Sequence, residues 1–515
     1  NGIKTGDDWS LAPYKYEGGI KMQTSVKVWP RKLGKINEMI YGHFAEHLGR
    51  CIYDGIYNEK SPKSDSRGFR KDIMEAIKRI KCPILRWPGG NFVSAYHWEN
   101  GIGPLEKRPQ LPNYIWGGVE SNRFGTDEFI QYCREIGTEP YLAVSLGTAT
   151  LDEAISWLEY CNLDTPTKYS RMRRENGHPE PYGVKYWGIG NEVYGPWQVG
   201  HCSAAEYAEK LRQYTQFMKG VDRSIKVIAV GADDPNWDMT VLKHAGHLID
   251  YISIHEYHGS DDYLGTVASV YYCEQRLRLL EALIKHLRLD HVKISFDEWN
   301  VWYKISAEKE SMDKGIVLLE EPYALKDGLF AAGIFTVMHR MADTVHMANL
   351  AQMVNALGMI KTKGDEMVLT PIYHAFDLFV NHTGRTRLNM AVDCDTYDIN
   401  TRTFVEGRNS FKLSGVPYVD GSATYDEEKQ VLSVALINYY QKEEEVRLDL
   451  SGIGIKKKAV LNVLTGSAPD EMNDFDNPDR IKLIKKELDN CSTEMLLKLD
   501  PMSANVIEFS LESSL

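Results

Sequence analysis

The sequence predicts a (β/α)8 TIM barrel followed by a smaller antiparallel β-sandwich of jelly-roll type. The barrel is predicted because apolar runs and longer helical stretches alternate eight times over roughly 350 residues. The runs are apolar at almost every position, as expected for parallel strands with helices on one face and packed side chains on the other. The sandwich is predicted because the helical stretches stop beyond Arg385 and short alternating strands follow.

The N-terminal residues precede this alternation. Residues 1–21 lack the apolar segment of a signal peptide and Met22 is a candidate native start, so we interpret residues 1–21 as a leader or a vector-derived extension. The alternating run Thr24–Trp29 predicts a strand that has no place in the barrel. We therefore expect residues 22–34 to form a strand that joins the sandwich, residues 35–385 to form the barrel, and residues 386–515 to form the sandwich.

The barrel elements follow in order. The predicted strands are Met39–Glu46, Pro83–Gly90, Glu139–Gly147, Val184–Glu192, Lys226–Asp234, Asp250–Tyr257, Val292–Asn300 and Val345–Gln352. The predicted helices are Phe69–Lys81, Thr126–Ile136, Asp152–Tyr160, Ala204–Val221, Val267–Arg288, Leu325–Met341 and Ile372–Val380. The capping-box spacing marks two helix starts, at Thr150 and Ser203. A doubly wound open sheet is the alternative, but no Gly-x-Gly-x-x-Gly turn follows the first strand to favour it.

The predicted strands of the sandwich are short and are separated by Gly, Asp, Asn and Pro. They are Ser410–Leu413, Val431–Asn438, Glu445–Leu450, Ala459–Leu464, Met495–Leu499 and Asn505–Phe509. Short alternating runs with such separators are typical of antiparallel sheets.

The composition indicates a soluble globular protein. Of 515 residues, 43% are hydrophobic and 26% are charged. The net charge of -12 argues against a nucleic-acid partner, which requires a basic face. No apolar stretch approaches the ~20 residues that cross a bilayer, so we expect no membrane association. The eight cysteines form no Cys-x-x-Cys pair, which indicates packed thiols in a reduced compartment, and we expect a cytoplasmic protein.

Two glutamates mark the candidate active site. The run Val184–Glu192 ends in an Asn followed by Glu192, and the run Val292–Asn300 carries Glu298 beside a tryptophan. In a (β/α)8 barrel the carboxyl ends of the strands surround the active-site mouth, so the two carboxylates are expected to meet there. A single glutamate at a strand end is about as often a salt-bridged barrel residue as a catalytic one. Two of them in this setting indicate a glycosidase, which cleaves a sugar between two carboxyl groups.

The roles of the two carboxyl groups follow from glycosidase chemistry. We assign Glu192 as the acid/base and Glu298 as the nucleophile of a retaining mechanism, in which the carboxyl groups lie about 5 Å apart. Asn191 is expected to hydrogen-bond the sugar 2-hydroxyl, a contact that strengthens as the anomeric carbon becomes positive. Arg86 and Tyr257 are expected to keep Glu298 ionised through charge and hydrogen bonding.

Tryptophan, histidine and cysteine residues near the strand ends give weaker evidence about the site. Flat apolar side chains beside polar groups suit a sugar ring, and six tryptophans are expected near the mouth: Trp87, Trp98, Trp116, Trp197, Trp299 and Trp302. His255 and His258 lack the His-Glu-x-x-His spacing and would not share a helical face, so no metal site is predicted. Cys273 lies in a helical run and is interpreted as a packing residue.

Six longer segments carry a family resemblance. They are GHFAEHLGRCIYDGIY, LRWPGGNFVSAYHWENGIGP, YWGIGNEVYGPWQ, ISIHEYHG, FDEWNVWY and MANLAQMVNALG. Together they resemble glycoside hydrolase family 51, the α-L-arabinofuranosidases. Gly-Asn-Glu alone would indicate only a broad clan of retaining glycosidases, whereas the six segments in this order are specific to the family.

The resemblance implies a retaining exo-enzyme that removes terminal arabinofuranosyl groups from arabinan, arabinoxylan and related oligosaccharides. Glu192 matches the family's acid/base and Glu298 matches its nucleophile. The residues implied to surround the sugar are Glu46, Arg86, Asn91, Trp116, Asn191, His255, Tyr257, Trp302 and Gln352. Family members need no cofactor and often assemble as hexamers, so we expect no cofactor and a homo-oligomer.

Two other functions stay open from the residues alone. The same barrel and mechanism could serve a retaining endo-glucanase, a xylanase or a β-xylosidase, and an endo-enzyme would need an open cleft where an exo-enzyme needs a closed pocket. A carbohydrate-binding protein on an inactive barrel is the third hypothesis. The presence of both Glu192 and Glu298 speaks against it.

Overall fold

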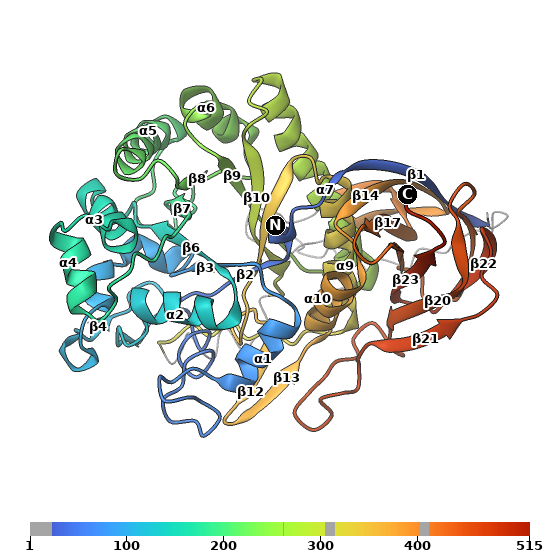
Figure 1. The fold of residues 1–515 in the computed structure, drawn as a ribbon, viewed down its shortest axis with the longest axis horizontal. Helices are drawn as coiled ribbons and strands as arrows, with labels where there is room; N and C mark the ends of the chain where they lie inside the picture. The colour runs from blue at the N-terminus through green and yellow to red at the C-terminus, as the bar shows by residue number, and fades with distance from the viewer. Residues whose placement is uncertain (1–22, 261, 304–314, 402–410) are drawn as a thin grey trace, which may run out of the picture.

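The computed structural model describes residues 23–515 except 261, 304–314 and 402–410. The predicted leader, residues 1–21, therefore lies outside the described residues. The main part of the chain is a closed barrel of parallel strands, as predicted (Figure 1). The barrel strands are β2 (Gly42–Phe44), β3 (Ile84–Trp87), β6 (Glu139–Val144), β7 (Tyr186–Ile189), β8 (Lys226–Ala229), β9 (Tyr251–His258), β10 (Lys293–Val301) and β11 (Val345–Ala351).

Helices surround the barrel and connect its strands (Figure 1). The described α-helices are α1 (Lys71–Arg79), α2 (Thr126–Ile136), α3 (Leu151–Asn162), α4 (Lys168–Glu175), α5 (Ala204–Val221), α6 (Pro235–Ala245), α7 (Tyr263–His286), α9 (Leu325–Arg340) and α10 (Pro371–His382). The described 3₁₀ helices are η1 (Glu38–Tyr41), η2 (Asn91–Ala95), η3 (Trp98–Gly101) and η4 (Leu105–Lys107). Thr150 and Ser203 cap α3 and α5, as predicted.

Several elements differ from the sequence prediction. The run Lys226–Asp234 is a strand only over β8, because the Asp234 side chain accepts from Asn236 N at 2.9 Å and begins α6. The first half of the run Met39–Glu46 is η1, because the Asn37 side chain accepts from Met39 N at 3.0 Å. Helix α4 was not predicted, since its sequence is almost entirely polar and charged.

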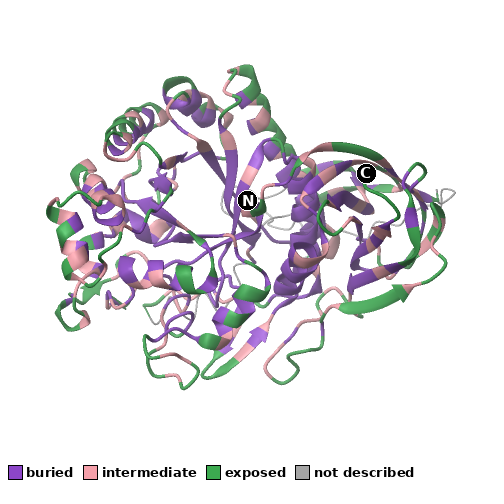
Figure 2. Cartoon of the chain, viewed as in Figure 1, coloured by how far each residue is buried: buried purple, intermediate pink, exposed green. Residues whose placement is uncertain are grey.

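The second part of the structure is rich in sheet and curls around its own core. Nine strands hydrogen-bond in the order β21 (Ile484–Leu488), β20 (Ile455–Leu464), β23 (Ser503–Leu511), β18 (Val431–Asn438), β17 (Val419–Asp426), β14 (Thr386–Asp393), β1 (Thr24–Lys35), β19 (Glu444–Asp449) and β22 (Glu494–Leu499). Side chains from strands near both edges share one hydrophobic cluster, which includes Leu461 and Leu499. The two halves of the sheet therefore face each other, with buried residues inside and exposed residues outside (Figure 2).

Three hairpins lie outside the large sheet among the described residues. They are β4 (Leu111–Pro112) with β5 (Val119–Glu120), β12 (Ile360–Lys363) with β13 (Glu366–Leu369), and β15 (Thr396–Thr401) with β16 (Phe411–Pro417). The prediction that Ser410–Leu413 forms a strand of the sandwich is wrong. Its described residues belong to β16, which pairs with β15 outside the large sheet. Leu413 and Val416 pack with Ala268 of α7, so this hairpin rests on a barrel helix.

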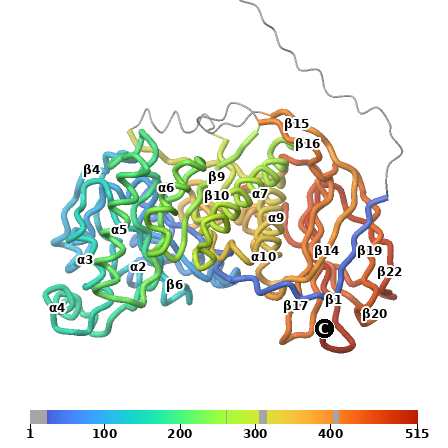
Figure 3. The backbone as a smooth tube through the Cα atoms, turned by 90° about the horizontal axis from the view of Figure 1, so that it is seen from above, coloured from blue at the N-terminus to red at the C-terminus, as the bar shows by residue number. Residues whose placement is uncertain are grey.

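One face of the sheet-rich part packs against the barrel. Figures 1 and 3 show α9 and α10 between the barrel strands and the sheet. In β18, Val434 and Leu436 belong to the sheet's own core, whereas Ala435 and Ile437 belong to the barrel's hydrophobic cluster. Alternate residues of a strand point to opposite faces, so this strand contributes to both cores. Within the described ranges, no helix has the length and apolar character needed to cross a membrane.

Candidate active site

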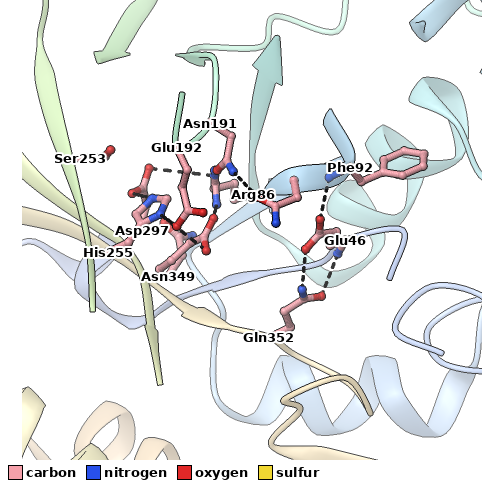
Figure 4. A network of polar contacts seen from close by, with 12 residues as sticks. Glu46, Arg86, Phe92, Asn191, Glu192, Ser253, His255, Asp297, Asn349 and Gln352 are labelled. Atoms are coloured by element: carbon pink, nitrogen blue, oxygen red, sulfur yellow. Dashed lines mark hydrogen bonds and ion pairs between the residues drawn. The ribbon is translucent and has the colours of Figure 1, made fainter. Parts of the chain in front are cut away.

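The candidate site lies at the carboxyl ends of the barrel strands. Glu298 is on β10, beside His255 of β9, and Glu192 follows the end of β7. One oxygen of each glutamate and one ring nitrogen of His255 lie within 4.8 Å of one another. Figure 4 shows Glu192, His255 and Asp297 grouped together, with Arg86 between this group and Glu46. The barrel therefore brings the two predicted catalytic carboxylates to one point.

Glu298 is buried and held by two donors. Arg86 Nη1 donates to Glu298 Oε1 at 2.5 Å, and Tyr257 OH donates to Oε2 at 2.7 Å. A Cβ atom at Gly90 would lie only 2.9 Å from Glu298 Oε1, so glycine allows the loop after β3 to approach the carboxylate. Each oxygen of Glu298 therefore accepts one hydrogen bond, and the two contacts fix the position of the carboxylate.

Arg86 also orients Asn191. Its Nη2 donates to Asn191 Oδ1 at 2.6 Å, which leaves the amide Nδ2 facing Asn91 Oδ1 at 3.4 Å. The amide oxygen of Asn191 is therefore occupied by Arg86, and Nδ2 is the donor side of this amide. Sequence reasoning placed Arg86 against Glu298; the contact between Arg86 and Asn191 is an additional feature of the structure.

Glu192 receives three donors. His255 Nδ1 lies 2.8 Å from Oε1, Tyr194 OH donates to Oε1 at 3.3 Å, and Trp197 Nε1 donates to Oε2 at 3.2 Å. The backbone at Glu192 has φ of 43°, a left-handed conformation that is uncommon outside glycine and is found often at functional sites. Burial alone would raise the pKa of Glu192, but the hydrogen bond and charge of His255 lower it below its usual value.

Asp297 lies on the far side of His255. His255 Nε2 is 3.1 Å from Asp297 Oδ1, and Tyr141 OH donates to Asp297 Oδ2 at 2.7 Å. Burial opposes a charge on His255, but the Glu298 charge and the hydrogen bonds to Asp297 and Glu192 raise its pKa to about 10. Sequence reasoning assigned no role to Asp297, which directly precedes Glu298; successive strand residues normally point to opposite faces.

Glu46 forms the other wall of the site. Its Oε1 accepts from Phe92 N at 3.0 Å and from Trp116 Nε1 at 2.9 Å, and its Oε2 accepts from Gln352 Nε2 at 2.8 Å. Trp116 lies on the hairpin between β4 and β5, which thereby closes over the strand ends. Burial raises the pKa of Glu46 to about 7, and the nearby charge of Glu298 acts in the same direction.

The six tryptophans divide between mouth and core. Trp87, Trp98 and Trp299 are buried in the hydrophobic core, so their predicted place at the mouth is wrong. Trp87 stacks on Phe129 of α2 at 5.0 Å between ring centroids, which shows that it faces a helix. The other three are partly exposed; Trp302 packs edge-on to Tyr257, and Trp197 is 56% exposed.

The donor set suits a neutral polar ligand. Glu192, His255 and Glu298 have atoms close enough to reach one cation. However, the guanidinium of Arg86 already pairs with Glu298 at 2.5 Å, and His255 contacts two carboxylates. Each of the three groups therefore already has a charged or hydrogen-bonding partner within the protein.

Comparisons with known proteins agree with this geometry. A family model described as "Alpha-L-arabinofuranosidase 1 domain" matches residues 76–275, and one described as "Alpha-L-arabinofuranosidase C-terminal domain" matches residues 297–503. The chain is 39% identical to alpha-L-arabinofuranosidase C of Emericella nidulans over 461 residues, covering 85% of this chain and 88% of that protein. It is 35% identical to the intracellular exo-alpha-(1->5)-L-arabinofuranosidase 1 of Bacillus subtilis over 442 residues, covering 82% and 85%.

A solved structure agrees as well. The thermostable GH51 alpha-L-arabinofuranosidase from Thermotoga petrophila RKU-1 is 49% identical, with a TM-score of 0.90, and the match covers 94% of this chain and all of that one. Sequence and architecture thus match along nearly the whole length. The chain belongs to the α-L-arabinofuranosidases of glycoside hydrolase family 51.

Proposed function

We propose that the protein is a retaining, exo-acting α-L-arabinofuranosidase that releases terminal arabinofuranosyl groups from arabinan- and arabinoxylan-type oligosaccharides. The observation that carries the proposal is the approach of the Glu192 and Glu298 carboxylates to within 4.8 Å. Retaining glycosidases have their carboxyl groups about 5 Å apart, whereas inverting enzymes separate them by about 6.5–9.5 Å to admit a water molecule.

In the first step, Glu298 attacks the anomeric carbon while Glu192 donates a proton to the leaving oxygen. Arg86 and Tyr257 hold Glu298 in place for attack. Glu192 must carry a proton at this stage, although His255 lowers its pKa in the free site. A bound sugar excludes water and so favours the neutral acid.

In the second step, Glu192 removes a proton from water, and the resulting hydroxide releases the sugar from Glu298 with its original configuration. The lowered pKa of Glu192 suits this step, because the residue must act as a base. Asn191, with its amide oxygen held by Arg86, donates its N–H to the sugar 2-hydroxyl.

The exo mode is supported by the wall around Glu46. Trp116 and Gln352 both donate to the Glu46 carboxylate. The hairpin of β4 and β5, the end of β11 and the loop after β2 are therefore joined on one side of the site. Glu46 would accept hydrogen bonds from the hydroxyls of a terminal sugar, and the wall would stop a longer chain from passing through. The Bacillus subtilis relative is named as an exo-enzyme, which agrees with this mode.

The test is activity on aryl α-L-arabinofuranosides. Glu298→Ala and Glu192→Ala should each lower turnover by several orders of magnitude. Azide should rescue Glu192→Ala on a substrate with a good leaving group and give a glycosyl azide of retained configuration. A near-wild-type rate in either variant would reject the assignment. Comparable turnover of aryl xylosides, or random cleavage of intact polymers, would instead favour a β-xylosidase or an endo-enzyme.

Assembly and location belong to the same proposal. We expect a homo-oligomer, with a hexamer as the predicted state, and light scattering of the purified protein would test it. A cytoplasmic location agrees with the word "intracellular" in the name of the Bacillus subtilis relative. Fractionation of the producing cells would test the location.

A further inference from the structure

His255 has no ring nitrogen left for a sugar. Its Nδ1 lies 2.8 Å from Glu192 Oε1, and its Nε2 lies 3.1 Å from Asp297 Oδ1. An ionised carboxylate only accepts hydrogen bonds, so a histidine between two of them satisfies both contacts only when both nitrogens carry hydrogen. The buried position between Glu192 and Asp297 therefore selects the imidazolium form.

Other charged and hydrogen-bonding side chains surround His255. From β10, Glu298 Oε2 lies 3.6 Å from His255 Nδ1, and Asp297 is fixed by Tyr141 of β6. Arg86 of β3 brings a second cation close, with its Nε 4.0 Å from Asp297 Oδ2. Among the described residues, Glu46 after β2, Tyr194 after β7 and Tyr257 on β9 are further titratable groups that face the site.

Building on the function proposed above, we propose that Asp297 is a positioning residue for the acid/base. Through its contact with Nε2, Asp297 keeps His255 as a cation, and this cation determines the pH at which Glu192 gains and loses its proton. His255 is thus a positioning residue as well, and acts on the reaction through Glu192 and not by binding sugar.

The consequence for Glu192 follows from distance. The His255 cation is 2.8 Å from Glu192 Oε1, while Asp297 lies beyond the imidazole ring. In Asp297→Asn the side chain keeps its shape and its acceptor oxygen but loses its charge. His255 then loses the Nδ1 proton, and a lone pair faces Glu192 where a donor stood. Because the closer charge dominates, Glu192 retains its proton to higher pH.

The experiment is the pH profile of kcat/KM for an alkyl α-L-arabinofuranoside, whose poor leaving group requires the Glu192 proton. The alkaline limb of Asp297→Asn should move upward by about one pH unit or more. His255→Asn should move it in the same direction, and the double variant should add little. With a dinitrophenyl leaving group, which needs no proton, the shift should disappear. Tyr141→Phe removes a hydrogen bond but keeps the Asp297 charge, and should give no upward shift.

The outcomes separate the proposals. If Asp297→Asn loses activity while its alkaline limb stays in place or moves downward, Asp297 does not control the Glu192 proton. Its role would then be structural. Thermal unfolding of Asp297→Asn shows whether it is folded, and His255→Asn provides an independent route if it is not. Failure of the proposed function is recognised separately: either the wild type would not hydrolyse the alkyl substrate, or Glu192→Ala would hydrolyse it at the wild-type rate.

Discussion

At the scale of single residues, the buried carboxylates at the barrel mouth differ in whether a cation contacts them. Glu46, Asp297 and Glu298 are buried carboxylates, and Arg86 and His255 are the cations in contact with them or close by. A buried charge without a partner is costly, so each carboxylate depends on its neighbours. Glu298 has direct contact with a cation, whereas Glu46 accepts only from neutral donors.

This difference predicts a pH-dependent stability at Glu46. Burial raises its pKa from 4.5 to about 7, so the folded protein binds this proton more tightly than the unfolded chain. The resulting stability is present at low pH and is lost as the pH rises from about 4.5 to about 7. The free energy of unfolding of Glu46→Gln relative to the wild type should therefore rise by about 3 kcal/mol between about pH 4.5 and pH 8.

Denaturant unfolding of both proteins across this pH range measures the effect. The pH-independent offset caused by the lost contact with Gln352 cancels in the comparison. Glu38→Gln, a change at an exposed glutamate, is the control and should follow the wild type at every pH. A constant difference between Glu46→Gln and the wild type would contradict the raised pKa.

At the scale of elements, the strand ends were predictable but the local geometry was not. The repeated succession of apolar runs and helical stretches predicted the barrel, and with it the meeting of Glu192 and Glu298. The position of Asp297 depends on an irregularity in β10, where the pairing with β9 shifts between Ser295 and Glu298. Such a bulge lets Asp297 and Glu298, adjacent in the chain, reach the same site. The apolar run that predicts this strand contains no signal for such a bulge.

The hairpin of β4 and β5 was also beyond prediction, since its strands are very short. Glu120, at its end, accepts from Tyr53 OH at 2.5 Å and from Asn122 N at 2.6 Å, and lies 2.9 Å from His47 Nδ1. These buried contacts anchor the hairpin that brings Trp116 to Glu46. The hairpin therefore depends on Glu120 for its position over the site.

We predict that Glu120→Gln raises KM several-fold with little change in kcat. Loss of the charged anchor loosens Trp116, which affects sugar binding in ground state and transition state alike. Steady-state kinetics on an aryl arabinofuranoside measure both constants. Glu106→Gln, at an exposed position in the segment before β4, should leave KM unchanged. An equal fall in kcat without a change in KM would contradict the anchoring role.

At the scale of the whole molecule, barrel and sheet are joined by a polar network beside the shared apolar contact. Arg340 of α9 donates to Asp420 of β17 at 2.7 Å and to Glu274 of α7 at 2.6 Å. His339 bridges Tyr41 at 2.7 Å and Ser422 at 2.9 Å. The network holds the sheet against the barrel and contains neither Glu192 nor Glu298.

We predict that Arg340→Met lowers the free energy of unfolding by about 2–3 kcal/mol and leaves kcat/KM unchanged. Two carboxylates lose their cation, and the loss is less than for a fully buried pair because the Arg340 side chain is 30% exposed. Arg278→Met is the matched control: it also contacts Glu274 but is more exposed, and should cost less than about 0.5 kcal/mol. Equal effects of the two changes in thermal unfolding would contradict the role of Arg340.

The central claim is that two carboxyl groups act on one anomeric carbon, with Glu298 forming the covalent bond. The direct measurement is peptide mapping of Glu192→Ala after brief reaction with dinitrophenyl α-L-arabinofuranoside. Without its base, this variant should accumulate the glycosyl-enzyme, and mass spectrometry should locate the arabinofuranosyl group on Glu298. A group attached to another residue, or an intermediate that forms equally in the Glu192→Ala/Glu298→Ala double variant, would contradict the account.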